Sequence, residues 1–396
     1  MKEVQPLTAS NRLPWIDAAR GFAIFGIFIV NIATFNGPYF LYGDGQNLWG
    51  PGQSPTWQAL IDIFVQASFY SLFSFLFGFG MYIIYNNAQA KQLEKPNALL
   101  VKRLVILLII GMVHAFLIWH GDILISYALI GFVLLLFMKQ SNTSLLVWSL
   151  CLLMIPSGIF SGLLYILTPY VESEGLVNQA SIDASFQNYG DGTWGNILWQ
   201  NLIDWLIANN PFNFFFIFCN LLPIFLLGLM FAKNRWLHDI EGNKKFLRKV
   251  WVISLAIFIL FKAGPYMFGN PMWFSLLQDS IGGTASAIFY VISVAFIYSY
   301  GKGFFDLIGN VGKMALSNYL FQSILGVILF YNIGLGWYGE FSIEGTVLIV
   351  AIVYVFQVIM STLWLQRFER GPVEWLWRRL IYRKPIPFVK KDKLAS

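Results

Sequence analysis

The first residues whose types and spacing could do chemistry lie near the start of the chain. Asp17 and Arg20 are three residues apart, so they share one face of a helix and can form an ion pair. Asn31 follows Arg20 by eleven residues, close to three full turns, and so falls on the same stripe. Two interpretations stay open. The pair is either structural at the membrane interface, or part of a cytoplasmic anion site for a phosphate-bearing donor or substrate.

A second constellation surrounds two closely spaced histidines. His114 lies inside an apolar segment, about 9 Å below His120 along a helix axis. Asp122 can cap the next helix, and Asp122 or Tyr127 can orient His114. His114 is either a hydrogen-bonded core residue or the general base or proton relay of a reaction or transport step. We expect His120 to cap an outer turn in water and His238, in a basic loop, to be a solvated bystander.

Three further polar residues lie within apolar segments. Lys262 precedes an expected helix break and should either snorkel outward or pair with Asp279 or Asp62. Asn318 and Gln322 are four residues apart, which predicts a polar stripe facing the inside of a bundle. With the first constellation, these three complete the predicted substrate-binding set. No metal-ligand cluster, Ser–His–Asp order or phosphate-binding loop is readable in the sequence, so no metal is predicted.

The elements that hold these residues must lie in a membrane. Of the 396 residues, 57% are apolar and 12% are Asp, Glu, Lys or Arg, whereas a soluble protein carries about 25% charged residues. This composition excludes disordered, collagen-like, coiled-coil and disulfide-rich classes. Basic residues stand between apolar segments and not in a soluble cluster, which argues against nucleic-acid binding. We predict one integral membrane domain over 1–396.

A spanning helix needs about 20 apolar residues, and ten stretches are read as spans: 16–36, 58–85, 99–119, 122–138, 144–168, 211–232, 250–268, 278–299, 313–332 and 345–366. With both termini cytoplasmic, 25 of the 26 Lys and Arg residues fall on or near the cytoplasmic side, with Lys262 the exception. The sequence therefore predicts an all-α polytopic membrane bundle. Interfacial helices are expected near 196–210 and 372–383, followed by a basic cytoplasmic tail over 384–396.

Five stretches carry a resemblance to a known family: residues 16–23 with Asn31, 73–80, 111–127, 312–322 and 367–378. In these stretches the chain resembles the YeiB-like bacterial inner-membrane proteins of unknown function, a family described as transport-associated. The resemblance runs from residue 12 to about 383. It implies a multi-pass protein of the bacterial inner membrane.

The motif of Asp17, Arg20 and Gly21 also resembles, more distantly, the transmembrane acyltransferases, which include the lysosomal heparan glucosaminide acetyltransferase. That resemblance implies transfer of an acyl group from cytoplasmic acyl-CoA to an acceptor on the outer side. The related surface-sugar enzymes usually have a histidine where this chain has Asn31. The lysosomal branch has an asparagine there and uses a histidine in the next outer loop, but 37–57 contains none. An acyltransferase would therefore need His114 or His120 as its base.

Three hypotheses about function follow. In the first, Arg20, with Lys102 and Arg103, binds the phosphate groups of an acyl-CoA, and His114 acts as base or transient acyl carrier. In the second, the protein transports or exports a small metabolite coupled to protons. The third is an accessory or scaffold role. No resident cofactor is predicted beyond the acyl-CoA donor of the first hypothesis. The expected partners are the lipid bilayer and a small-molecule substrate or acyl acceptor, and the sequence gives no oligomeric state.

Overall fold

The computed structural model describes residues 13–43, 48–92, 95–170, 177–382 and 386–390. These residues form a helical bundle without a β-strand, and their only sheet-like pairing is one isolated bridge between Phe368 and Val389. The predicted all-α polytopic bundle is confirmed. The predicted basic tail, 384–396, lies mostly outside the described residues.

Eight helical segments of the described chain are long and apolar enough to cross a membrane. They are α1 (Pro14–Asn36), α3 (Pro55–Phe64) with α4 (Ser68–Ala90), α5 (Pro96–Leu117), α7 (Asn142–Leu167), α10 (Pro211–Lys233), α11 (Lys244–Phe258) with its extension to Phe268, α12 (Ser275–Leu277) with α13 (Gly283–Ile297), and α16 (Ile343–Arg367). The predicted fourth span is a shorter helix, α6 (Leu124–Leu134). The predicted ninth span is α15 (Ala315–Phe330), which is bent by 73° from α14 (Lys302–Lys313).

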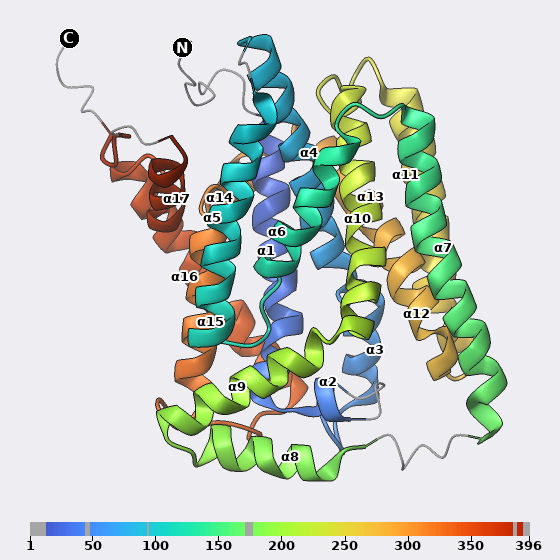
Figure 1. The fold of residues 1–396 in the computed structure, drawn as a ribbon, viewed down its shortest axis with the longest axis vertical. Coiled ribbons are helices and arrows are strands. Elements are labelled where there is room, and N and C mark those ends of the chain that lie inside the picture. The colour runs from blue at the N-terminus through green and yellow to red at the C-terminus, as the bar shows by residue number, and fades with distance from the viewer. Residues whose placement is uncertain (1–12, 44–47, 93–94, 171–176, 383–385, 391–396) are drawn as a thin grey trace.

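The two ends of the bundle differ (Figure 1). One end, here called the α17 end, contains α17 (Pro372–Tyr382) and the first turns of α1 and α5. At the α9 end, α9 (Trp194–Ala208), α8 (Gln179–Ser185) and the short α2 (Tyr39–Tyr42) lie across the bundle. Helices are thus present where interfacial helices are predicted. The basic, tryptophan-rich α17 end is the predicted cytoplasmic side, and that orientation stays a prediction.

The amphipathic pattern of α9 has a direction that the sequence does not reveal. Its polar face points into the protein, where Gln200, Asn201 and Asp204 are almost fully buried, whereas Trp199 is 62% exposed. An interfacial helix places its apolar face against the bilayer. The buried polar face makes α9 a lid over polar groups at this end of the bundle.

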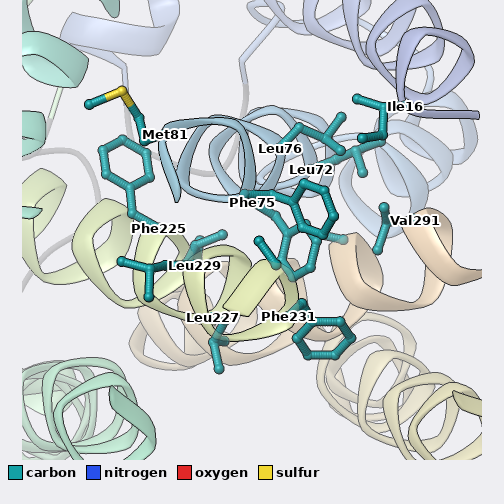
Figure 2. Close-up of a cluster of buried hydrophobic side chains, with 14 of the residues drawn as sticks. Ile16, Leu72, Phe75, Leu76, Met81, Phe225, Leu227, Leu229, Phe231 and Val291 are labelled. Carbon is teal, nitrogen blue, oxygen red and sulfur yellow. The ribbon is translucent and has the colours of Figure 1, made fainter. Parts of the chain in front are cut away.

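The centre of the bundle is the contact between α4 and α10. Phe75 of α4 packs edge-on against Phe231 of α10, with ring centroids 5.1 Å apart, among the buried side chains of Figure 2. A Cβ on Gly78 would overlap the carbonyl of Phe225, and one on Gly228 would overlap that of Phe75. These small residues let the two backbones approach closely, as in other membrane bundles.

A second close approach joins α1 to α14 at the α17 end. A Cβ on Gly21 would overlap the carbonyl of Ile308, and one on Gly312 would overlap that of Asp17. Only hydrogen fits at these two positions. The contact fixes the first turns of α1, and with them Asp17 and Arg20, at the α17 end of the bundle.

One carboxylate docks α17 on the bundle. Glu374 accepts hydrogen bonds from the backbone N–H groups of Leu316 (2.7 Å) and Ser317 (3.0 Å) in the first turn of α15, where unpaired N–H groups favour an anion. The indole of Trp377 donates to the carbonyl of Arg103 in α5 at 3.3 Å. Helix α17 is therefore held against both α15 and α5.

Candidate functional site

A cavity of about 900 Å³ lies at the α17 end, bounded by α1, α4, α5, α6, α10, α14, α15 and α17. Among the described residues, eight basic side chains and three carboxylates line it. The basic ones are Arg20, Lys91, Arg103, Lys233, Arg235, Lys313, Arg370 and Arg378, and the acidic ones are Asp17, Glu369 and Glu374. A concave site with such an excess of one charge attracts anions.

The lining becomes apolar toward the middle of the bundle. Ile24 and Ile27 of α1, Phe73 and Phe77 of α4, and Tyr319 of α15 contribute to the walls there. The cavity therefore joins a cationic region to an apolar one, and it suits an elongated ligand with an anionic head and an apolar tail.

The predicted pairing of Asp17 with Arg20 is present. Arg20 Nη1 lies 3.4 Å from Asp17 Oδ1, and both residues line the cavity. The Arg20 side chain is 33% exposed, so the pair lies at a water-accessible wall and not in a dry core. Asn31 is half-buried further along α1 and is not among the residues that line the cavity.

His114 and Asp122 form a fully buried pair. His114 Nδ1 lies 2.8 Å from Asp122 Oδ1, and both side chains are 0% exposed. Asp122 Oδ2 also accepts from the backbone N–H of Ile125 at 2.8 Å, in the first turn of α6. The Asp122 carboxylate therefore caps α6 and orients the imidazole of His114, the two roles predicted for it.

The other ring nitrogen of His114 meets a serine that sequence reasoning missed. His114 Nε2 lies 2.8 Å from Ser323 Oγ on α15. An ionised Asp122 only accepts, so beside it Nδ1 carries the proton and Nε2 can accept from the Ser323 hydroxyl. The same hydroxyl also lies 3.3 Å from the carbonyl of Tyr319 in its own helix. Asp122, His114 and Ser323 thus form a carboxylate–imidazole–hydroxyl chain, the arrangement that activates a hydroxyl in acyl transfer.

Tyr319 stands between this chain and the cavity. Its ring centroid is 5.1 Å from that of His114, its hydroxyl donates to the carbonyl of Gly121 at 3.2 Å, and it lines the cavity. Tyr127 does not take the role of orienting His114. Its hydroxyl is bonded instead to Ser74 Oγ (2.6 Å) and to the carbonyl of Tyr70 (3.1 Å).

Asn318 and Gln322 share a buried stripe, as predicted, but that stripe faces α16 and not the cavity. Asn318 Nδ2 donates to Ser361 Oγ at 3.1 Å, and Gln322 Nε2 donates to Gln357 Oε1 at 2.9 Å. Gln357 in turn donates to the carbonyl of Asn318 at 3.0 Å. These amides join α15 to α16, and neither Asn318 nor Gln322 is among the residues that line the cavity.

Lys262 belongs to a separate polar centre. Its ammonium group lies 3.0 Å from Asp279 Oδ1 and 3.5 Å from Asp62 Oδ1, and its side chain is 0% exposed. The predicted pairing is confirmed with both carboxylates. Asp62 also accepts from Tyr266 (2.7 Å) and Gln278 (2.9 Å). Lys262 does not line the cavity.

The prediction for His120 is wrong, because α9 covers it, and His238 is half-buried and not fully in solvent. His120 is 5% exposed beneath α9, with Nδ1 3.3 Å from the Tyr189 hydroxyl and 3.7 Å from Asp204 Oδ2. Burial lowers the pKa of His120, and the charge of Asp204 opposes that shift. His238 stacks on Phe79, with centroids 5.3 Å apart, and lines the cavity.

Comparison with known proteins places the chain in a family. The family profile described as "Protein of unknown function (DUF418)" matches residues 231–384. "Uncharacterized protein YxaH" of Bacillus subtilis is 37% identical over 418 aligned positions, which cover 100% of both chains. The chain belongs to the YeiB-like DUF418 family. "Uncharacterized protein YeiB" of Escherichia coli is 27% identical over 95% of this chain and 98% of its own length. No solved structure matches the chain significantly.

Membership of the DUF418 family confirms the YeiB-like resemblance. The segment matched by the DUF418 profile contains Tyr319, Ser323 and Glu374, while Arg20 and His114 lie before it. The similarity to YxaH extends over the whole chain and so includes every element that lines the cavity. None of these printed names states an activity, so a function has to be argued from the site.

Proposed function

We propose that the protein is an acyltransferase-like membrane enzyme, which takes an acyl group from an acyl-CoA at the α17 end and passes it to an acceptor hydroxyl on the α9 side. One observation carries the proposal. The apolar inner end of a cation-lined cavity reaches Tyr319, whose ring packs against the imidazole of the buried Asp122–His114–Ser323 chain.

The cavity has the two chemistries that an acyl-CoA requires. Its phosphate groups would meet basic side chains such as Arg20 and Arg103, since guanidinium groups bind phosphate oxygens with paired hydrogen bonds. Arg103 is also stacked over Trp377, with its guanidinium carbon 4.5 Å from the ring centroid, which holds its side chain at the wall. The acyl chain would extend along Ile24, Ile27 and Phe77.

In the proposed reaction the Ser323 oxygen attacks the thioester carbonyl, and the carbon–sulfur bond breaks. The hydroxyl proton passes to His114 Nε2 and from there to the departing CoA sulfur. The acceptor hydroxyl then attacks the seryl ester, gives its proton to His114, and Ser323 recovers a proton as it leaves. Asp122 keeps the imidazole in the reactive tautomer throughout. Tyr319 has to rotate away from His114 for the thioester to reach Ser323.

The test uses the detergent-purified full chain with octanoyl-CoA. We expect thermal stabilisation by the thioester and a covalent octanoyl adduct in the intact mass. The adduct should be absent in Ser323→Ala and His114→Gln. It should remain in Ser149→Ala, a buried serine of α7 that, like Ser323, hydrogen-bonds its own helix backbone.

Arg20→Gln with Arg103→Gln should remove the stabilisation. The matched control is Lys245→Gln, since Lys245 is an exposed cation on α11 outside the cavity. Absence of both stabilisation and adduct in the unmodified protein would overturn the proposal. Proton-coupled flux of a small metabolite into liposomes, without any effect of CoA, would favour the transport hypothesis.

A further inference from the structure

A second hollow lies on the other side of the wall made by α5 and α17. It has a volume of about 1050 Å³ and is bounded by α5, α15 and α17. Its walls include six apolar side chains that are between 38% and 50% exposed: Val101, Val105, Ile109, Val113, Leu376 and Leu380. Four of these side chains, Val101, Val105, Ile109 and Val113, belong to the spanning helix α5, so along that helix the hollow, here called the α5 groove, faces the hydrocarbon of the bilayer.

The α5 groove is charged at one end only. Lys102, in the first turns of α5, and Arg379, on α17, line it at the α17 end, and no Asp or Glu is among its described lining residues. The guanidinium carbon of Arg379 lies 5.2 Å from the ring centroid of Trp375, which holds the charge at the level of a membrane interface. Basic groups placed there attract anionic lipid headgroups.

Neighbouring residues of α5 serve the two hollows separately. Lys102 lines the α5 groove and Arg103 lines the cavity, because successive residues of a helix point about 100° apart. Helix α17 is divided in the same way, with Trp377 and Arg378 on the cavity and Leu376 and Arg379 on the groove. The cations of the groove are therefore not available to a ligand in the cavity.

We propose that the α5 groove binds an anionic phospholipid from the leaflet at the α17 end. The lipid phosphate lies between Lys102 and Arg379, and one acyl chain follows Val105, Ile109 and Val113 along α5. The far end of the groove reaches the level of His114 on α5, whose side chain is itself 0% exposed. Lys102 and His114 are separated by about 18 Å of helix rise, comparable with the roughly 15 Å hydrocarbon depth of one leaflet. An amphiphile with one anionic end matches this distribution of charge, and a water-soluble anion or a polar peptide does not.

The experiment measures lipid retention by native mass spectrometry of the full chain, titrated with phosphatidylglycerol or phosphatidylcholine. We expect phosphatidylglycerol to be retained more tightly than phosphatidylcholine. Lys102→Gln with Arg379→Gln should weaken phosphatidylglycerol binding roughly 30-fold, from the usual contribution of two basic residues near a membrane surface. The control Lys245→Gln with Arg248→Gln removes the same charge from exposed positions on α11 and should change little.

A second pair of variants tests the apolar part. Ile109→Trp fills the groove and should reduce retention, whereas Ile159→Trp, at an exposed site on α7 outside the groove, should not. Inorganic phosphate and glycerol 3-phosphate should not compete with the lipid. Competition by either would replace the lipid site with a simple anion site.

Equal binding of the two lipids, or equal losses in test and control variants, would overturn the proposal. The outcome is separable from acyl transfer. Stabilisation by octanoyl-CoA should persist in the Lys102→Gln, Arg379→Gln variant, because neither residue lines the cavity.

Discussion

Asp122→Ala is the substitution whose consequence the structure defines most sharply. The change removes two hydrogen bonds at once, one to His114 Nδ1 and one to the backbone N–H of Ile125. Both Asp122 and His114 are 0% exposed, so water cannot take the place of the carboxylate. The imidazole N–H is left buried without a partner, and the first turn of α6 loses its cap.

The size of the effect follows from these two losses. A lost helix cap costs about 1 kcal/mol, and a buried donor without a partner costs about 1–3 kcal/mol. We therefore expect Asp122→Ala to lower the free energy of unfolding by about 2–4 kcal/mol. Asp122→Asn keeps an oxygen that can cap α6, and should lose only the charge-assisted bond to His114, about 1.5–3 kcal/mol.

The assay is equilibrium unfolding in mixed micelles with increasing dodecyl sulfate, followed by circular dichroism. A double-mutant cycle of Asp122→Asn with His114→Gln isolates the pair, and the coupling energy should be about 1.5–3 kcal/mol. Asp183→Ala removes an exposed carboxylate of α8 and should stay within about 0.5 kcal/mol of the parent. A coupling energy below about 0.5 kcal/mol would refute the reasoning, because His114 would then have no dependence on Asp122 for its orientation.

Three further predictions concern other parts of the bundle. Burial lowers the pKa of His120, so the unfolded chain binds more protons than the folded one below about pH 6.5. The free energy of unfolding should therefore fall as the pH drops through that range. His120→Gln should flatten this dependence when unfolding is measured at pH 7.5 and at pH 5.5. Gly312→Ala forces a methyl group onto the carbonyl of Asp17, and should abolish a monodisperse peak in size-exclusion chromatography, whereas Gly303→Ala, with open space around it, should not. A thiol at Asn243, in a Cys151→Ala background, should be labelled by an impermeant maleimide only after the membrane is permeabilised; labelling of intact cells would reverse the predicted orientation.

Hydropathy predicts eight of the ten expected spans at spanning length, because a spanning helix has to be apolar over nearly its whole length, whereas α6 and α15 are shorter than expected. It does not say which face of a helix meets which neighbour. Asn318 and Gln322 were the polar residues visible on α15, yet they bond to α16, and the residue that meets His114 is Ser323. That partner is 209 positions away in the sequence. Its spacing of four residues from Tyr319 was the one signal that could have indicated a shared face.

Two other differences have equally specific causes. The first hypothesis gives Lys102 and Arg103 one phosphate-binding role, but adjacent residues on a helix point about 100° apart, and only Arg103 lines the cavity. His120 was expected in water because a turn between two spans usually meets solvent. The polar face of α9 covers His120 instead and places Asp204 beside it. This contact joins segments far apart in the sequence, so the spacing of residues around His120 does not reveal it.

The position of α17 along the chain has a consequence for biogenesis. This helix is a wall of both the cavity and the α5 groove, and its contacts to α15 and α5 come from Glu374 and Trp377. The spanning helices of the described residues precede it in the sequence, so they can be inserted into the membrane before it is synthesised. Neither compartment is complete until α17 has been synthesised and has folded back against α15 and α5. A chain truncated before Gly371 would keep the membrane-spanning helices of the described residues and lack a wall of both binding compartments.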